Sequence, residues 1–387
     1  MNVPKLRFKE FTDEWKLYKL NELCNIKGRI GFRGYTTNDL VGKESGGAIS
    51  LSPSNIVGTS INTNKENTYI SNFKYEESPE IKIYNGDIIF TKTGSSYGKV
   101  ALVENLSEKA TLNPQLVVLK DINCNRKVLC ELIASPSVQH QIENTIVGGT
   151  IPTLSQNIMS EYKLYLPSIN EQTKLGNMLQ LLDKKIELQS KKIEALKLYK
   201  KGLIIKLNID KSKWNEYKIA DIFNITRGIV IPKNKLSDDY KNDYIYPVYS
   251  SQTSNNGILG YDKTYDFDGK YLTWTTDGAN AGKVFFRDGK FRCTNVCGIL
   301  FNDNNLYIDE LTAELLNLET PKHVSYVGNP KLMNNVMSNI KILLPNKNES
   351  ENINSILKKI NTKIDLEVYR LDKLQDLKKG LMQSMLV

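Results

Sequence analysis

Two long stretches of the chain carry apolar residues at alternating three- and four-residue spacing. The first runs from Asn170 to Asn208 and the second from Asn348 to about Leu386. The repeated apolar positions, which we call the seam, are Leu179, Leu182, Ile186, Ile193 and Leu196 in the first stretch and Leu357, Ile360, Ile364, Leu371 and Leu374 in the second. Sustained spacing of this kind is typical of helices that pair in a coiled coil. We expect two long helices that pair with each other; the alternative is that each packs only on its own domain.

The segments before these two stretches have a different pattern. Short runs of β-branched and aromatic residues alternate there with Gly and Asn, which predicts strands joined by turns. The clearest strand-like runs are Asp87–Thr91, Leu116–Leu119, Tyr271–Trp274 and Lys283–Phe286. Helical patterns interrupt them at Arg126–Ser135 and Asp309–Leu318.

An internal repeat organises the whole chain. Residues 152–203 return without a gap as residues 330–381, and nineteen of the 52 aligned positions are identical. The beginnings of the two copies also match, because Trp15 and Asn25 correspond to Trp214 and Asn224. The offset is 199 residues at the beginnings and 178 at the ends, so the first copy is about 21 residues longer inside. Matching ends with diverged interiors are what two copies of one scaffold with different binding surfaces would leave.

These patterns predict an α+β protein with an internal two-fold repeat. We expect mixed α/β recognition domains at residues 1–165 and 211–343, each followed by a long helix at residues 166–210 and 344–387. The two helices are expected to pair as an antiparallel coiled coil.

Composition narrows the possible partners and compartments. Lys and Arg number 52 against 43 for Asp and Glu, a formal charge of +9, which favours a polyanionic partner such as nucleic acid. The sequence contains no run of 18 apolar residues, so it predicts no membrane span. The charged segment Met1–Trp15 lacks the apolar stretch of a signal peptide. Five cysteines in such a chain suggest free thiols, so we expect a cytoplasmic protein.

Two glycine-rich segments resemble phosphate-binding loops. Gly94–Lys99 and Gly278–Lys283 are one residue too short, and Val100 and Val284 stand where the magnesium-binding Ser or Thr is needed. We therefore reject nucleotide hydrolysis. Either the lysines contact DNA phosphates, or the segments are plain hairpin turns.

No catalytic constellation stands out. Asn113-Pro114-Gln115 has only part of the Asn-Pro-Pro-aromatic motif of amino-methyltransferases, and no AdoMet loop follows a strand. Two histidines and the Cys293/Cys297 pair give no credible zinc spacing. We expect a chain that is not an enzyme and binds no cofactor or metal itself.

Polar loops supply the candidate DNA-binding residues, since Asn, Gln, Ser and Thr side chains can bond base edges and Lys or Arg can bond phosphates. In the first copy the candidates are Ser52, Ser54, Asn55, Lys92, Ser95, Tyr97 and Lys99. In the second copy they are Arg227, Ser250, Ser251, Gln252, Thr253, Asn280 and Lys283. For each of them the alternative is a residue that merely builds a polar turn.

The repeat resembles the specificity subunits of type I restriction-modification systems. The resemblance covers essentially the whole chain and rests on the junctions Gly149–Leu154, Leu166–Gln172 and Leu181–Ile186, with Gly328–Leu332 and Leu344–Glu349 in the second copy. The second copy departs from the first by having Ser350 in place of Gln172.

The resemblance implies a role in phage defence through sequence-specific binding of double-stranded DNA. Each domain would recognise one half of a split site, and the helices would set the spacer. Two methyltransferase subunits would bring AdoMet, and restriction subunits would bring ATP and Mg. The alternative function is a non-catalytic coiled-coil adaptor without a DNA role.

Overall fold

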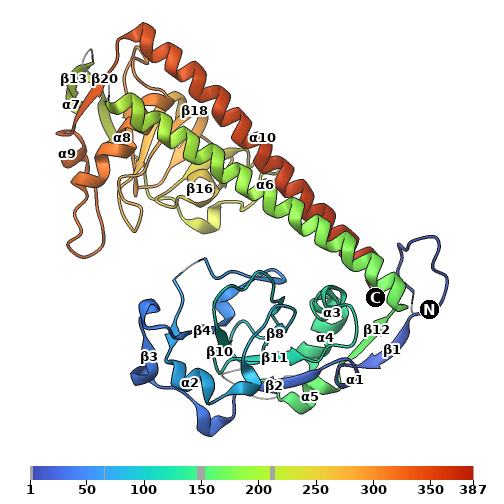
Figure 1. The fold of residues 1–387 in the computed structure, drawn as a ribbon. Coiled ribbons are helices and arrows are strands. Elements are labelled where there is room, and N and C mark those ends of the chain that lie inside the picture. The colour runs from blue at the N-terminus through green and yellow to red at the C-terminus, as the bar shows by residue number, and fades with distance from the viewer. Residues whose placement is uncertain (1–2, 65, 146–152, 210–213, 387) are drawn as a thin grey trace. The chain divides into compact units, whose positions relative to one another are not determined.

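The computed structural model describes residues 3–64, 66–145, 153–209 and 214–386. The chain divides into two compact units (Figure 1). The first unit contains residues 1–189 and 370–387, and the second contains residues 190–369. Each unit therefore takes part of both long helices, α6 (Ile169–Ile209) and α10 (Lys347–Met385). Among the described residues, no helix has the length and apolar character needed to cross a membrane.

The first unit is built from three sheets. A six-stranded sheet has the order β2-β11-β8-β9-β6-β5, a four-stranded sheet the order β10-β4-β7-β3, and β1 pairs with β12. The strands are β1 Lys16–Lys19, β2 Asn25–Gly28, β3 Leu40–Val41, β4 Ala48–Leu51, β5 Ile56–Val57, β6 Ser60–Ile61, β7 Tyr69–Ile70, β8 Ile88–Thr91, β9 Val100–Leu102, β10 Ala110–Leu112, β11 Leu116–Lys120 and β12 Lys163–Leu166. The short helices are α1 Leu20–Leu23, α2 Asn72–Glu76, α3 Arg126–Ile133, α4 Pro136–Asn144 and α5 Gln156–Ser160.

The central strands of the first unit are buried on both faces. In β8, Ile88 and Phe90 join one apolar core and Ile89 joins another. The first core includes α3 and the start of α6, and the second lies toward the four-stranded sheet. Burial on both sides explains the unbroken apolar runs that predicted β8 and β11 from the sequence.

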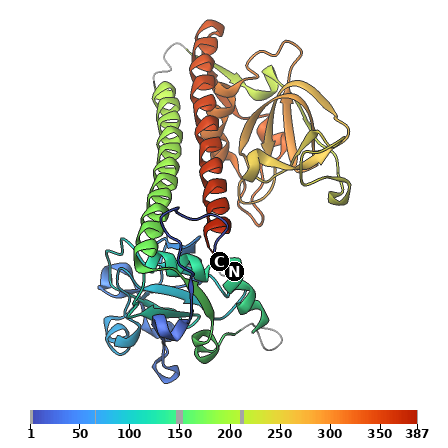
Figure 2. The same ribbon diagram turned by 90° about the vertical axis from the view of Figure 1, so that its right-hand side faces the viewer.

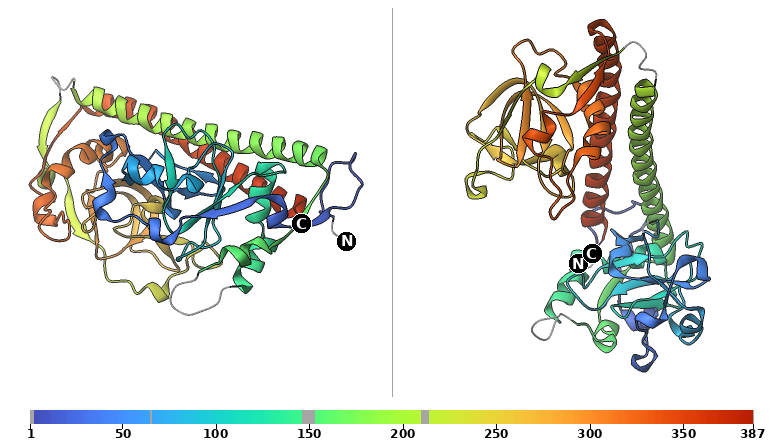
Figure 3. Two further views of the ribbon diagram at one scale, coloured as in Figure 1. Left: turned by 60° about the horizontal axis from the view of Figure 1, so that its bottom comes forward. Right: turned by 90° about the vertical axis from the view of Figure 1, so that its left-hand side faces the viewer.

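The second unit has fewer and longer strands. Its six-stranded sheet has the order β14-β19-β17-β18-β15-β16, and β13 pairs with β20. The strands are β13 Asn215–Lys218, β14 Asn224–Arg227, β15 Tyr246–Tyr249, β16 Ile258–Asp262, β17 Phe267–Thr275, β18 Val284–Cys293, β19 Cys297–Phe301 and β20 Lys341–Leu344. The short helices are α7 Ile219–Ile222, α8 Glu310–Glu319 and α9 Asn334–Met337. The α10 part of this unit lies between the α6 part and the sheet (Figures 2 and 3), and Ile204, Leu272 and Leu357 share one core.

The two units share a local frame. The adjacent strands β2-β11-β8-β9 correspond to β14-β19-β17-β18. The antiparallel pair that places Lys16 opposite Leu166 corresponds to the pair that places Asn215 opposite Leu344. The extra residues of the first copy accompany strands β3, β4 and β7 of its additional sheet.

Both long helices begin slightly earlier than the sequence suggested. The two stretches were placed from Asn170 and Asn348, but both residues lie inside the first helical turn. The α10 cap is Asn346, whose side-chain oxygen accepts the Glu349 N–H at 3.0 Å. At the start of α6, the Ser168 carbonyl accepts the Gln172 N–H at 2.9 Å. The acidic residues of the first turns contact side chains outside the helices. Glu171 forms an ion pair with Arg7 at 2.7 Å, and Glu349 accepts a hydrogen bond from the Trp214 indole N–H at 3.1 Å.

The seam positions are the sheltered positions of both helices. Leu179, Leu182, Ile193 and Leu357 are buried, and Ile186, Leu196, Ile360, Ile364, Leu371 and Leu374 are half-buried. Glu367 interrupts the seam of α10 and is only 2% exposed; its carboxylate lies 2.8 Å from Lys192 within the second unit.

Matched lysines near the ends of the long helices form ion pairs in each unit. In the first unit, Lys378 lies 2.7 Å from Asp183 and 3.2 Å from Glu131, which also pairs with buried Lys127. In the second unit, Lys200, which the repeat aligns with Lys378, lies 2.6 Å from Glu314 of α8. Each unit thus contains the beginning of one long helix and the end of the other.

Some expected positions lie outside the described residues. They are Gly149 and Pro152 of the first junction, and the boundary at residues 210 and 211.

Candidate nucleic-acid interface

The glycine-rich segments are hairpin turns with the same backbone hydrogen bonds in both units. In the first unit, the Thr91 N–H donates to the Lys99 carbonyl and the Gly98 N–H to the Thr91 carbonyl, at 2.8 and 2.9 Å. In the second unit, Thr275, Lys283 and Gly282 make the equivalent bonds at 3.0 and 2.8 Å. The glycines Gly94, Gly98, Gly278 and Gly282 all have positive φ, which explains why glycine recurs there.

Lys99 and Lys283 end these turns with exposed side chains. Among the residues that the structure describes, neither ammonium group has a carboxylate within 4.0 Å, unlike those of Lys127, Lys200 and Lys378. Lys283 lies over the Phe285 ring, 5.9 Å from its centroid. Two unneutralised cations at matched positions favour binding of a polyanion over a purely structural role for these turns.

Other strand ends gather around the hairpin turn of the second unit. We call this surface the second loop face; it consists of residues 227–230, 249–257, 276–283 and 294–296. The connecting hydrogen bonds run from Gly228 N–H to Cys297 O (3.1 Å), from Thr294 N–H to Tyr249 O (2.9 Å) and from Thr276 N–H to Val296 O (3.1 Å). The sheet therefore brings polar loops far apart in sequence to one edge.

The first unit has an equivalent surface. The first loop face consists of residues 28–31, 51–55, 92–99 and 113–115. Asn113 N–H donates to Leu51 O at 2.8 Å, and Lys92 N–H donates to Gln115 O at 2.9 Å, which reproduces two of the bonds of the second loop face. The candidate loops around Ser52 and Ser250 thus occupy matched places in the two units.

The predicted residues of the first loop face differ in their availability. Lys99, Ser95 and Ser54 are exposed, whereas Ser52 and Lys92 are half-buried. Tyr97 packs against the core of the unit. Asn55 is 3% exposed; its oxygen accepts from Ser52, and its Nδ2 donates to Asn62 and Asn67 at 3.0 and 2.9 Å. The expectation that Asn55 contacts DNA is therefore corrected: its amide holds the turn.

The second loop face shows the same division. Arg227, Asn280 and Lys283 are exposed, and the Arg227 guanidinium donates to Asn334 Oδ1 at 3.4 Å. Ser250, Ser251, Gln252 and Thr253 are half-buried. Ser250 Oγ bonds Thr294 Oγ1 at 3.0 Å, and the Gln252 amide donates to the Ile258 carbonyl, so both residues also shape the turn.

A buried arginine packs against the turn of residues 250–257. Arg287 in β18 is 4% exposed; its Nε donates to Thr273 Oγ1 at 3.2 Å, and its guanidinium lies 3.6 Å from the centroid of the Tyr249 ring and 4.5 Å from that of Phe285. Burial lowers the pKa of Arg287 from its ordinary value and raises that of Tyr249, because each charged form loses hydration. A Cβ on Gly257 would lie 2.9 Å from Arg287 Nη2, so this glycine allows the turn to close on the guanidinium.

Sequence reasoning missed three residues of the loop faces. Gln115 is exposed on the first face, although its segment had been considered only as a methyltransferase motif. Asn295 is exposed at the corresponding loop of the second face. Both loops directly precede an apolar strand, and that position was the available signal. The role of Arg287 had no signal in sequence, because its partners come from other strands.

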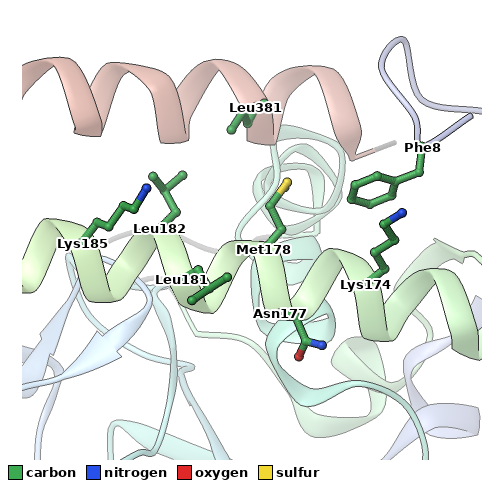
Figure 4. A pocket seen from close by; sticks show the side chains of 8 residues that line it. All are labelled: Phe8, Lys174, Asn177, Met178, Leu181, Leu182, Lys185 and Leu381. Atoms are coloured by element: carbon green, nitrogen blue, oxygen red, sulfur yellow. The ribbon is translucent and has the colours of Figure 1, made fainter.

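A groove of the first unit lies away from the first loop face. It has a volume of about 410 Å³ in the first unit and is lined by Phe8, Lys174, Asn177, Met178, Leu181, Leu182, Lys185 and Leu381 (Figure 4). Its lining offers no carboxylate, thiol, hydroxyl or imidazole group. Among the described residues, no three His, Cys, Asp or Glu side chains gather closely enough to hold a metal ion.

Comparison with known proteins points to one family. The model for the type I restriction modification DNA specificity domain matches residues 12–198 and again residues 211–376. A putative type I specificity subunit N-terminus of Mycoplasma pneumoniae is 46% identical over 142 residues, covering 36% of this chain and 74% of that protein. A second putative type I specificity subunit of the same organism is 36% identical over 216 residues, covering 54% and 78%. The crystal structure of a type I restriction-modification S subunit from M. genitalium superposes with a TM-score of 0.61 over 100% of this chain and 99% of that one; at 16% identity this likeness shows a shared fold.

Proposed function

The chain belongs to the family of type I restriction-modification DNA specificity subunits, and on that premise we propose that its two loop faces recognise the two halves of a bipartite site in duplex DNA. Direct recognition needs cations for phosphates and short polar side chains for base edges. Each loop face offers both kinds of group on a rigid sheet edge. On the first face, the exposed candidates are Ser54, Ser95, Lys99 and Gln115; on the second, they are Arg227, Asn280, Lys283 and Asn295.

The observation that carries this proposal is the matched hairpin turn. Two domains with different loops keep the same turn, the same backbone hydrogen bonds and a lysine without a carboxylate partner among the described residues. A phosphate contact is common to all DNA sequences and can be conserved between domains, whereas base contacts must differ for the halves to differ.

We propose that α6 and α10 pair as an antiparallel coiled coil and give the chain an internal two-fold repeat. The support is that each unit joins the beginning of one helix to the end of the other, through Asp183 with Lys378 and Lys192 with Glu367. The helix pair would fix the spacer between the half-sites. At 1.5 Å per residue, a helix of 41 residues is about 60 Å long, comparable to one to two turns of DNA.

The same helices are proposed to dock two methyltransferase subunits. Leu188 and Leu366 occupy matched positions outside the seam and are 55% and 47% exposed, which suits binding of a partner protein to both helices. In this scheme AdoMet enters with the methyltransferase subunits, and ATP and Mg with restriction subunits. This chain itself performs no chemistry, and it acts in the cytoplasm, where the DNA is.

An adaptor without a DNA role is the competing function. Selection from a pool of random-sequence duplexes, bound by the full chain and sequenced, separates the two. We expect enrichment of one motif with two specified blocks and an unspecified spacer of fixed length. Salt-sensitive retention of all sequences with no enriched motif would instead favour the adaptor.

A further inference from the structure

A narrow loop of the second unit projects beside its hairpin turn. We call residues 325–331 the finger, which is drawn in orange between α8 and α9 (Figure 1). Ser325 and Lys331 exchange two backbone hydrogen bonds, both of 2.9 Å, at its base. The finger also pairs with the hairpin turn, because Leu332 N–H donates to Thr276 O and Gly278 N–H donates to Pro330 O, each at 2.9 Å.

This pairing fixes where the finger points. Thr276 lies next to Leu332 and Gly278 next to Pro330, so the two segments run antiparallel. The path from Thr276 to Asn280 in the hairpin therefore runs in the same direction as the path from Leu332 back to Gly328 in the finger. The tips of the hairpin turn and the finger project in the same direction, and the finger extends the second loop face.

The tip of the finger is apolar and uncovered. Tyr326 is 68% exposed and Val327 is 94% exposed, and Gly328 turns the chain with a φ of 75°. An aromatic and a β-branched side chain, adjacent in sequence and exposed on a hydrogen-bonded loop, bury little apolar surface within the fold. Such a feature marks a site where another molecule supplies apolar contact.

Three cations lie on segments that adjoin the base of the finger. Lys283 ends the neighbouring turn, Arg227 bonds Asn334 three residues after the finger, and Lys331 at the base lies 4.0 Å from Asp277, so all three lie on the side of the finger's base. A partner that is anionic outside and apolar inside fits this arrangement. Duplex DNA has that chemistry, since stacked bases lie behind a phosphate backbone.

We propose that Tyr326 and Val327 form a wedge that enters the DNA beside the second half-site and partly unstacks one base step. This inference rests on the proposed DNA-binding function of the second loop face. Apolar side chains inserted between base pairs kink the duplex and bring more backbone into contact with the protein. Because pyrimidine–purine steps unstack most readily, the wedge adds sequence preference at a step that no hydrogen bond recognises.

The test uses the full chain and the duplex enriched by the selection described above. The fluorescent base 2-aminopurine is placed at successive positions across and beside the second half-site, where its emission rises on unstacking. Tyr326→Ala with Val327→Ala is compared with Leu198→Ala with Tyr199→Ala, a pair on α6 that is also more than half exposed (69% and 62%). Both variants should melt like the wild type, since the altered side chains are exposed.

We expect the wild type and the α6 control to raise emission at one step, and the finger variant to lose that rise. We also expect specific binding by the finger variant to fall about tenfold, the scale of one lost stacking contact. A mismatch at the same step should restore its binding, because the duplex is then already unstacked. Unchanged emission and affinity in the finger variant would overturn the wedge.

Two other results have separate meanings. If the finger variant keeps its DNA affinity but no longer copurifies with methyltransferase subunits, the finger binds protein and the wedge is wrong. If the wild-type chain enriches no motif, the proposed function itself fails. If the wild type and the finger variant enrich the same motif and bind it with the same affinity, only the wedge proposal is wrong.

Discussion

At the scale of single residues, the matched lysines are the most direct test of phosphate contact. We expect Lys99→Ala or Lys283→Ala to weaken binding to all DNA sequences and to reduce the slope of log affinity against log salt by about one. The reason is that each exposed ammonium group displaces one condensed counterion. Affinity measured across a salt series checks this, with Lys359→Ala on the exposed side of α10 as a control of equal charge. Unchanged salt slopes in both hairpin variants would identify these lysines as ordinary surface charges.

Arg287 is expected to govern sequence preference without touching DNA. Arg287→Met keeps most of the side-chain volume but removes the cation between Tyr249 and Phe285 and the bond to Thr273. The turn of residues 250–257 then loses its support. Because the variant also removes a buried charge, the melting temperature should change little. In duplex selection, base preference should weaken in the second block of the motif and stay unchanged in the first. Arg287→Lys keeps the charge but not the planar stack, so its base preference in the second block should be intermediate. Two sharp blocks would show that Arg287 is irrelevant to recognition.

Residue-level prediction from sequence succeeded where exposure follows from local pattern. A lysine after the last glycine of a hairpin has nowhere to be buried, so Lys99 and Lys283 were placed correctly on the surface. Asn55 and Asn280 look alike in sequence, yet only tertiary contacts with Asn62 and Asn67 bury the former. Amide side chains serve turns and bases equally well, so sequence cannot separate the two roles.

At the scale of elements, the long helices were the most predictable feature. Their seam positions recur ten times with one spacing rule, and the structure shelters all ten. Their first residues were less predictable, because Ser168 and Asn346 compete with Asn170 and Asn348 as caps and only the backbone decides. Strands β8 and β11 were found because both their faces are buried, whereas the two-residue strands β3 and β7 left no pattern.

The seam should hold the helices and, through them, the assembly. We expect Ile186→Asp with Ile364→Asp to lower the melting temperature and abolish copurification with methyltransferase subunits, since a carboxylate in an apolar seam loses hydration without a partner. The matched control is Leu188→Asp with Leu366→Asp, on exposed positions of the same helices. The control should melt normally and lose only the partner. Normal melting and normal copurification of the seam variant would overturn the coiled-coil proposal.

At the scale of the whole molecule, two units with one frame and different loops are what the proposed recognition of two half-sites by one chain requires. The frame β2-β11-β8-β9 and its counterpart β14-β19-β17-β18 are retained, while loop lengths and loop residues differ. Sequence comparison could find the retained frame because apolar and junction residues constrain it. The loop faces escaped prediction as surfaces, because their members are joined only by pairing between distant strands.

Independence of the two domains is the central claim, and exchange of one domain tests it. Residues 211–343 are replaced by the matching segment of a related subunit, and the methylated sites of a host that expresses the chimaera with its methyltransferase subunits are sequenced. Base contacts are local to one domain, so we expect a new second half-site. The first half-site should persist because residues 1–165 are unchanged, and the spacer should persist because both long helices are kept. A change in the first half-site or in the spacer would contradict the account, since it would mean that the two domains recognise DNA jointly.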